Sequence, residues 1–487
     1  MQPIDSFATD GTTFVNPLGL IFTLVMCILL VVLPRKYALL PIIILVCYMT
    51  MGMRIVVGGF NFTMLRIVLP FGWLRLMLRG EMKRLNFNVI DKIFLAWVFV
   101  SIVAATLLWQ SLEAFRGELG FAYNVLGFYF MFRFLIDDVD DVVRALRMFA
   151  VVIVPLAGAM ILEKITGRNS FAIFGGVPVL TMVRDGTLRC QGPFAHPILA
   201  GTFAATLFAM FIGLYLRGEK RLYAVTAIIA SSIIIITSAS SGPILTAVLG
   251  VGALALWPWR ASMRLLRWGM LLGVIGLQIV MKAPVWFLLA RVDIVQGSTG
   301  YHRAYLIDRA IANFSDWWLV GTKSTWGWAD KDAHLFDVTN AYIANGANGG
   351  FLGMVLFIAI IALCFKAVGR TVRLGEKTDS KANLIIFWAL GASLFSHAAT
   401  FLSVTYFDQN FVNWYLLLAM ISSVAGSSLL MSRPAFFAKL YEEPAVEAAA
   451  GSQAGVAPAG RADDRLFISR LQAQPKLALG DVSKQRS

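Results

Sequence analysis

The chain has 487 residues and a formal net charge of +14, and 58% of its residues are hydrophobic whereas only 14% are charged. Soluble proteins average about 45–50% apolar and about 25% charged residues, so this balance excludes an ordinary soluble protein and indicates a polytopic membrane protein. Most Lys and Arg residues lie in short segments between apolar runs, as orientation signals do, so we expect no nucleic acid among the partners.

Apolar runs that are long enough to cross about 30 Å of hydrocarbon recur along the whole chain. They predict an all-α integral membrane protein with about 12–13 transmembrane helices in one domain, residues 1–431. The predicted spans are 17–33, 39–57, 62–77, 89–109, 117–136, 146–162, 197–216, 223–237, 243–257, 268–281, 342–365, 383–403 and 411–431.

Basic residues in the short loops predict the orientation. With the N-terminus outside, every basic cluster falls on one side of the membrane, which is then the cytoplasmic side. The clusters are Arg35-Lys36; Arg79, Lys83 and Arg84; Arg133, Arg144 and Arg147; Arg217, Lys220 and Arg221; Arg260, Arg264 and Arg267; and Lys366, Arg370, Arg373, Lys377 and Lys381. Two long loops, 164–196 and 282–340, then face outward. The Ala- and Gly-rich tail, 432–487, is expected to be cytoplasmic and disordered because it lacks large apolar clusters.

The two outward loops carry Arg residues, although short outer loops are usually poor in them. Arg presents a planar fork that binds phosphate through two hydrogen bonds, which suits the diphosphate of a lipid-linked sugar. Each Arg could instead pair with a nearby acid, such as Asp185, Asp293 or Asp308. The outer Arg residues are Arg168, Arg184, Arg189, Arg291, Arg303 and Arg309.

The second outward loop also contains a predicted short helix over 300–311, where apolar residues recur at helical spacing. Four tryptophans follow it, Trp317, Trp318, Trp326 and Trp328. Such a cluster is typical of an interfacial belt, and indole faces also stack on sugar rings.

Several motifs occur in order over residues 186–357. They are Gly186-Thr187-Leu188-Arg189-Cys190-Gln191-Gly192-Pro193-Phe194-Ala195-His196-Pro197, Thr237-Ser238-Ala239-Ser240-Ser241-Gly242-Pro243, Gly300 with Arg303 and Ala310-Ile311, Asp316-Trp317-Trp318-Leu319-Val320-Gly321, Asn340-Ala341-Tyr342 and Gly349-Gly350-Phe351-Leu352-Gly353. This series resembles the O-antigen ligase and Wzy-type polysaccharide polymerase superfamily, in which an outer helix begins near an Arg and an Asn-containing motif opens the next span.

The resemblance implies a GT-C-like glycosyltransferase of the bacterial inner membrane that acts on an undecaprenyl-diphosphate-linked glycan among membrane lipids. Flippase and chain-length regulator proteins are possible partners. Ligases of this family often have a His beside the Asn, where this chain has Thr339. A polymerase of exopolysaccharide or O-antigen is therefore favoured over a ligase. A transporter and a structural partner of a synthase complex stay as alternatives, although no paired halves are evident.

Glycosyl transfer from a diphosphate requires stabilisation of the leaving charge and orientation of an acceptor hydroxyl. His334 and Asp337, shortly before Thr339, are the two alternative general bases. No acidic cluster of metal-ligand character is evident, so we expect a metal-independent reaction without a cofactor. The expected contacts to the diphosphate and glycan are Arg189, Arg291, Arg303, Arg309, His196, Asn340 and Tyr342.

Some of these polar residues have a structural alternative. His196 and Asn340 could instead cap the starts of spans, and the Ser-rich segment is expected to form a tight turn, so that Ser240→Ala should have little effect. Within the predicted spans, Arg66 is expected to pack against Glu118. His397 is expected to be a hydrogen-bonded core residue.

Overall fold

The computed structural model describes residues 13–82, 85, 87–291, 300–328, 338–376, 379–407 and 409–425. The two predicted general bases, His334 and Asp337, and the predicted tail lie outside these ranges. The described chain is mostly helical. Six helices of this part are long and apolar enough to cross a membrane: Val89–Trp109, Val139–Thr166, Pro197–Arg217, Trp257–Val280, Ala341–Gly375 and Lys381–Thr400.

A helix lies at each of the predicted spans. The helices are α1 Pro17–Val32, α2 Leu39–Tyr48, α3 Met64–Leu78, α4 Val89–Trp109, α5 Leu112–Leu135, α6 Val139–Thr166, α7 Pro197–Arg217, α8 Arg221–Thr237, α9 Ser241–Ala255, α10 Met263–Val280, α13 Ala341–Gly375, α14 Lys381–Thr400 and an unlabelled helical segment, 409–425. The last segment and α7 contribute several of the largest core side chains, such as Trp414, Tyr415 and Phe203.

The second predicted span, 39–57, is wrong in its second half. Helix α2 ends at Tyr48, and the chain then forms an antiparallel hairpin of β1 Arg54–Val57 and β2 Phe60–Thr63. The turn consists of Gly58 and Gly59, which have φ angles of 61° and 82°. Two successive residues with positive φ are what a tight two-residue hairpin requires, and an apolar strand on either side resembles a span in composition.

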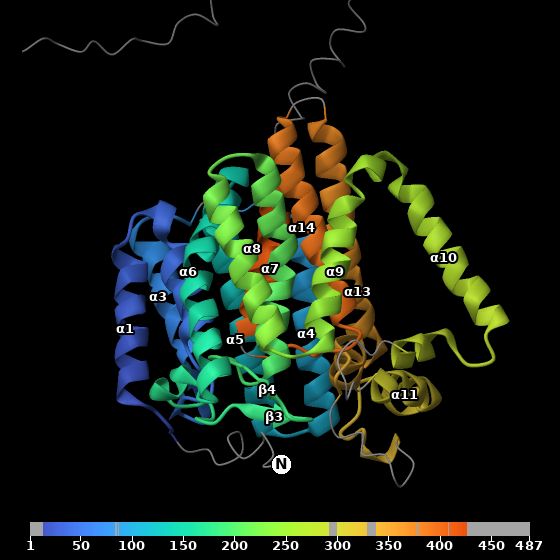
Figure 1. The fold of residues 1–487 in the computed structure, drawn as a ribbon. Helices are drawn as coiled ribbons and strands as arrows, with labels where there is room; N and C mark the ends of the chain where they lie inside the picture. Colours follow the sequence, from blue (N-terminus) through green and yellow to red (C-terminus); the bar gives the residue numbers. More distant parts are fainter. Residues whose placement is uncertain are drawn as a thin grey trace, which may run out of the picture. The chain divides into compact units, whose positions relative to one another are not determined.

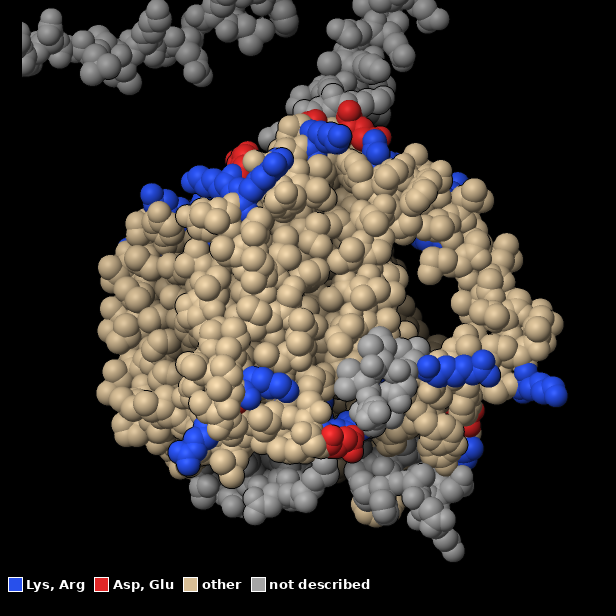
Figure 2. Space-filling view, viewed as in Figure 1, with Lys and Arg blue, Asp and Glu red and all other residues tan. Residues whose placement is uncertain are grey.

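The two long loops meet at one end of the helix bundle. The first contains the hairpin of β3 Met182–Arg184 and β4 Thr187–Arg189, and the second contains η5 Val285–Arg291, α11 Gly300–Ala312 and the short α12 Phe314–Trp317. Figure 1 shows β3, β4 and α11 at the lower end, whereas the turns that join α7 to α8 and α13 to α14 lie at the upper end. In Figure 2, Lys and Arg gather toward the two ends and leave a broad band without charged side chains between them. This distribution is that of a membrane-embedded protein.

Helix α10 stands apart from the other helices (Figure 1). None of its residues is buried, and apolar side chains such as Leu265, Leu272 and Val280 are largely exposed. Figure 2 shows an opening between this helix and the rest of the bundle. An apolar helix without protein neighbours is stable only where lipid surrounds it, so α10 also supports a membrane setting.

Gly350 breaks α13 and joins it to the segment after α12. Its φ and ψ angles are 68° and −178°, a conformation that only glycine adopts without strain. On one side of the joint the Phe351 amide donates to the Trp318 carbonyl at 2.8 Å, and on the other the Thr322 amide donates to the Ala347 carbonyl at 2.8 Å. A Cβ atom on Gly350 would lie 2.3 Å from the Leu319 carbonyl oxygen. The two Gly-containing motifs of the sequence are therefore parts of one joint.

A Gly350→Ala protein is expected to lose about 1–3 kcal/mol of stability from backbone strain alone, and more from the contact with Leu319. Thermal unfolding of the purified protein in detergent measures the loss. Gly369→Ala is the matched control, because Gly369 lies in the same helix and has open space around it. The control should be neutral or slightly stabilising. Equal unfolding temperatures for the two variants would contradict the assigned role of the joint.

Two polar residues inside the helices, Arg66 and His397, have protein partners. Arg66 does not pair with Glu118 as expected; its Nε donates to Asn124 Oδ1 at 3.0 Å, and its Nη1 to the Asn61 carbonyl at 2.5 Å. His397 is a hydrogen-bonded core residue, as predicted, with Nδ1 2.8 Å from the Tyr406 hydroxyl. The amide on Asn124 can satisfy a guanidinium at this depth without a second buried charge.

Candidate functional site

The first outward loop folds onto one buried carboxylate, Glu163 at the end of α6. Its Oε1 accepts from the Gln191 amide at 3.1 Å and its Oε2 from the Gly192 amide at 2.9 Å. The Thr181 hydroxyl adds a third bond at 3.3 Å, and Asn169 Nδ2 donates to the Gly192 carbonyl at 2.7 Å. A carboxylate that accepts two backbone amides fixes the loop in one position. No motif or charge pattern of the sequence indicates this role for Glu163.

Arg189, the last residue of β4, is held by the Ser-rich turn between α8 and α9. Its Nη2 donates to Ser240 Oγ at 2.6 Å, and Ser240 Oγ donates to the Ser238 carbonyl at 3.0 Å. The backbone joins the same two segments, because the Cys190 amide donates to the Thr237 carbonyl at 3.0 Å. Arg189 is 7% exposed, and its Nε is buried without a hydrogen-bond partner. A buried guanidinium with an unused hydrogen-bond donor is suited to binding an anion.

Arg303, in the first turn of α11, is a second guanidinium of this kind. It is half-buried, and its Nε is also buried without a partner. Burial lowers its pKa, and the positive charge of Arg184 lowers it further. The same two causes, burial and then Arg184, lower the pKa of Arg189. Arg184 therefore acts electrostatically on both residues, and we refer to Arg184, Arg189 and Arg303, which the two outward loops contribute, as the Arg cluster.

Ion pairs within the described chain separate these Arg residues into two classes. Arg184 lies 3.7 Å from Asp185, and Arg309 lies 3.3 Å from Asp308 with its guanidinium over the ring of Tyr305. For Arg189 and Arg303, no ion pair occurs among the residues that the structure describes. The pairing alternative thus applies to Arg184 and Arg309, whereas Arg189 and Arg303 have no carboxylate partner among the described residues. Arg291, at the end of η5, is exposed.

His196 caps the start of α7, as the structural alternative predicted. Its Nδ1 accepts from the Ile198 amide at 3.2 Å, and Pro197 follows at the first helical position. Burial, followed by the charges of Arg189 and Arg184, lowers the pKa of His196 to about 4. The ring is therefore neutral near pH 7. Because Nδ1 is an acceptor, the proton lies on Nε2, and His196 presents a hydrogen-bond donor beside the Arg residues.

Asn340 and Tyr342 hold the start of α13 in place. Asn340 Oδ1 accepts from the Tyr342 and Ile343 amides at 2.9 and 3.1 Å, and its Nδ2 donates to the Leu402 carbonyl at 3.2 Å. The Tyr342 hydroxyl donates to the Ala398 carbonyl at 2.8 Å. Asn340 is 2% exposed. These bonds give Asn340 the capping role, and they join the Tyr342 hydroxyl to the end of α14.

Ser240→Ala is now expected to lower activity about tenfold. The substitution removes the hydrogen bond that positions the buried guanidinium of Arg189. This revises the expectation from sequence that the substitution has little effect. For the glycosyltransferase activity that the resemblance in sequence implies, the rate of glycan synthesis in isolated membranes measures the loss. Ser240→Thr keeps the hydroxyl and should restore most of the activity. Ser232→Ala is the matched control in α8, since the Ser232 hydroxyl bonds only to the Ile228 carbonyl one turn earlier. A Ser240→Ala protein as active as the control would rule out the positioning role.

The structure thus brings together Arg184, Arg189, Arg303 and the Nε2 side of His196, with Ser240 as the residue that sequence reasoning missed. The signal for Ser240 was present, since the Ser-rich turn is one of the motifs, but the sequence does not show which residue the turn contacts. Comparisons with protein-family models and with curated protein sequences find no match to this chain.

Proposed function

We propose that the protein polymerises lipid-linked oligosaccharide repeats, carried on undecaprenyl diphosphate, into exopolysaccharide or O-antigen at the outer face of the bacterial inner membrane. The observation that carries the proposal is the positive cluster of Arg184, Arg189 and Arg303, in which Arg189 and Arg303 form no ion pair within the described chain. Like charges brought together in a half-buried site are costly unless an anion joins them.

The position of the cluster favours a lipid-linked anion. Arg189 ends the β3–β4 hairpin and Arg303 begins α11, and both elements lie at one end of the apolar helices (Figure 1). A diphosphate on a polyprenyl chain presents its charge at this depth, directly outside the hydrocarbon. Forked donors on Arg189 and Arg303, together with the Nε2 proton of His196, match several phosphate oxygens at once.

The reaction is a displacement at the anomeric carbon of the donor repeat. The hydroxyl oxygen of the acceptor glycan forms a bond to that carbon, and the bond from the carbon to the diphosphate oxygen breaks. The diphosphate leaves with the bonding electron pair, and the Arg cluster stabilises its growing negative charge. The acceptor proton passes to a general base, for which His334 or Asp337 remains our proposal. The guanidinium groups supply the charge that a metal ion supplies elsewhere, so the proposed reaction is metal-independent and uses no cofactor.

The proposal includes a GT-C-like membrane architecture with the N-terminus outside and the C-terminus in the cytoplasm. In that orientation the cytoplasmic loops are the basic ones. The site then faces the periplasm, where repeats arrive from a flippase and where a chain-length regulator can reach the product. The absence of a His at Thr339 favours polymerisation over ligation, by the resemblance to the polymerase and ligase superfamily.

The test is the length profile of undecaprenyl-diphosphate-linked glycans in cells that lack the protein, compared with the same cells carrying a copy of the wild-type gene. Single repeats should accumulate on the lipid, and the wild-type copy should remove them. Long glycans stranded on the lipid would assign ligase activity instead. An unchanged profile would reject both activities and leave a transporter or a structural partner.

A further inference from the structure

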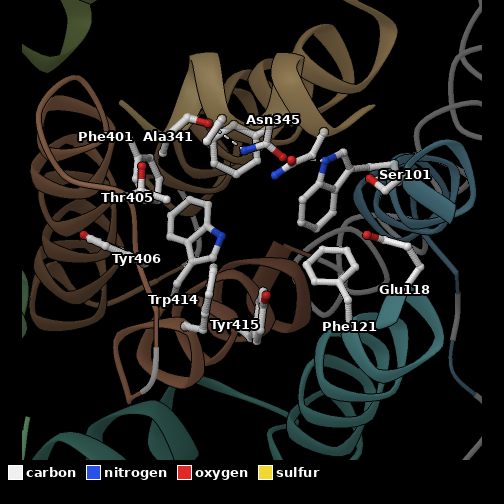
Figure 3. A pocket seen from close by; sticks show the side chains of 15 residues that line it. Ser101, Glu118, Phe121, Ala341, Asn345, Phe401, Thr405, Tyr406, Trp414 and Tyr415 are labelled. Atoms are coloured by element: carbon white, nitrogen blue, oxygen red, sulfur yellow. Dashed lines mark hydrogen bonds between the residues drawn. The ribbon is translucent and has the colours of Figure 1, made fainter. Parts of the chain in front are cut away.

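A cavity separate from the Arg cluster lies among α4, α5, α13 and the chain that follows α14. Its volume is about 160 Å³, roughly ten times the 10–15 Å³ that one water molecule requires, so it is more than a packing defect. Most of its lining is aromatic, and Figure 3 shows Trp414 and Tyr415 on one side and Phe121, Glu118 and Ser101 on the other. The lining residues come from segments that lie far apart in the sequence.

The aromatic wall of the cavity is fixed by its own contacts. Trp97 Nε1 donates to Asn345 Oδ1 at 3.0 Å, and Asn345 Nδ2 donates to the Ala341 carbonyl at 2.8 Å. The ring centroids of Trp97 and Phe121 lie 5.5 Å apart in an edge-to-face arrangement. A rigid wall of this kind costs little entropy when a ligand binds, because its side chains are already ordered.

Glu118 is the acidic side chain in this lining. No hydrogen bond or ion pair joins its carboxylate to another residue that the structure describes, and Arg66, its expected partner, bonds to Asn124 and Asn61 instead. The side chain is half-buried beside aromatic rings. A carboxylate in such surroundings is costly unless donors reach it, and a purely apolar ligand brings none.

We propose that this cavity binds a sugar ring of the acceptor glycan, with Glu118 accepting hydrogen bonds from the sugar hydroxyl groups. The identification of the sugar as an acceptor rests on the proposed function. A sugar ring matches both halves of the lining: its C–H face stacks on aromatic side chains such as Phe121, and its hydroxyl edge donates to a carboxylate. A polymerase holds two glycans at once, and the Arg cluster takes the diphosphate of the donor. The aromatic cavity is the second glycan site.

The experiment measures binding rather than activity, so its failure is distinct from failure of the proposed function. Full-length protein in lipid nanodiscs is titrated with oligosaccharides of one to three repeats, cut from the polysaccharide that the producing cells export. Tryptophan emission reports binding, because Trp97 and Trp414 line the cavity, and calorimetry gives an independent dissociation constant. Glu118→Gln and Phe121→Leu are expected to weaken binding about tenfold or more each.

The matched controls lie on the same helix, α5. Glu113→Gln changes an exposed carboxylate in its first turn, and Phe130→Leu changes a half-buried ring outside the lining. Both should bind as the wild type does. Phe121→Leu removes packing as well as a stacking face, so Glu118→Gln, which keeps the shape of the side chain, decides the case if the Leu variant fails to fold.

Three results would overturn the assignment. The first is wild-type protein that binds none of the oligosaccharides at millimolar concentration. The second is binding that Glu118→Gln and Phe121→Leu leave unchanged. The third is displacement of the oligosaccharide by undecaprenyl monophosphate, which carries no sugar and would assign the cavity to lipid.

Discussion

Arg303→Ala is expected to lower glycan polymerisation at least about 100-fold, the usual cost of removing one preorganised donor from a developing negative charge. The substitution should not lower the thermal stability of the protein. Arg303 has no ion-pair partner within the described chain, so its removal strands none of the carboxylates that the structure describes, and it relieves repulsion from Arg184. The variant should therefore unfold at the same temperature as the wild type or slightly higher, a stability–activity trade-off at a charged site. Polymer length and yield in membranes, together with thermal unfolding, measure the two effects.

Two variants test the reason for the loss. Arg303→Lys keeps the charge but not the fork, so its activity should lie between those of the wild type and Arg303→Ala. Arg309→Ala is the matched control on α11, because Arg309 is already engaged by Asp308 and Tyr305. It should lose far less activity. Polymer of normal length and amount from an Arg303→Ala protein at normal abundance would remove Arg303 from the site.

The helices could be predicted from the sequence because a membrane span requires a long run of apolar residues, and such runs are visible in the sequence. That reasoning failed in the second half of the span predicted over 39–57, where α2 has already ended and the apolar strand β1 pairs with β2 across Gly58-Gly59. Composition averages over a window and does not register the turn. The Gly-Gly pair was the local signal that separates a hairpin from a helix.

The sequence showed which charged residues to expect at the site, but not which groups those residues contact. Arg189 and Arg303 stood out because Arg is unusual in an outer loop, and the structure places both in one electrostatic cluster. Which Arg residues pair with acids, however, depends on distances that the chain order does not contain. The same holds for Ser240, whose partner lies in another loop. Asn340 was ambiguous for a physical reason, since an Asn before a helix is also the residue type preferred for capping.

A buried ionic network fastens the last helical segment, 409–425, to α4 and α5. Arg133 Nε and Nη2 donate to the two carboxylate oxygens of Asp91, each at 3.1 Å, and Arg133 Nη1 donates to Ser423 Oγ at 2.8 Å. The Tyr129 hydroxyl donates to Asp91 at 2.6 Å, and Ser422 Oγ adds a bond at 3.2 Å. Asp91 is 1% exposed and Arg133 is 6% exposed. Every polar group of the pair has a partner, which is the condition under which a buried charge pair is tolerated.

Arg133→Ala is expected to cost about 3–5 kcal/mol, because it leaves the carboxylate of Asp91 buried without its counter-charge. Thermal unfolding of purified protein in detergent measures this cost. The double variant Asp91→Ala with Arg133→Ala should lose less than the sum of the two single variants, since it strands neither charge. Arg35→Ala is the control for a pair near the surface: Arg35 and Asp137 lie 3.0 Å apart with side chains 29% and 39% exposed, and the expected loss is at most about 1 kcal/mol. Additive losses at Asp91 and Arg133 would show that the two side chains act independently, and would leave the last helix held by its apolar packing alone.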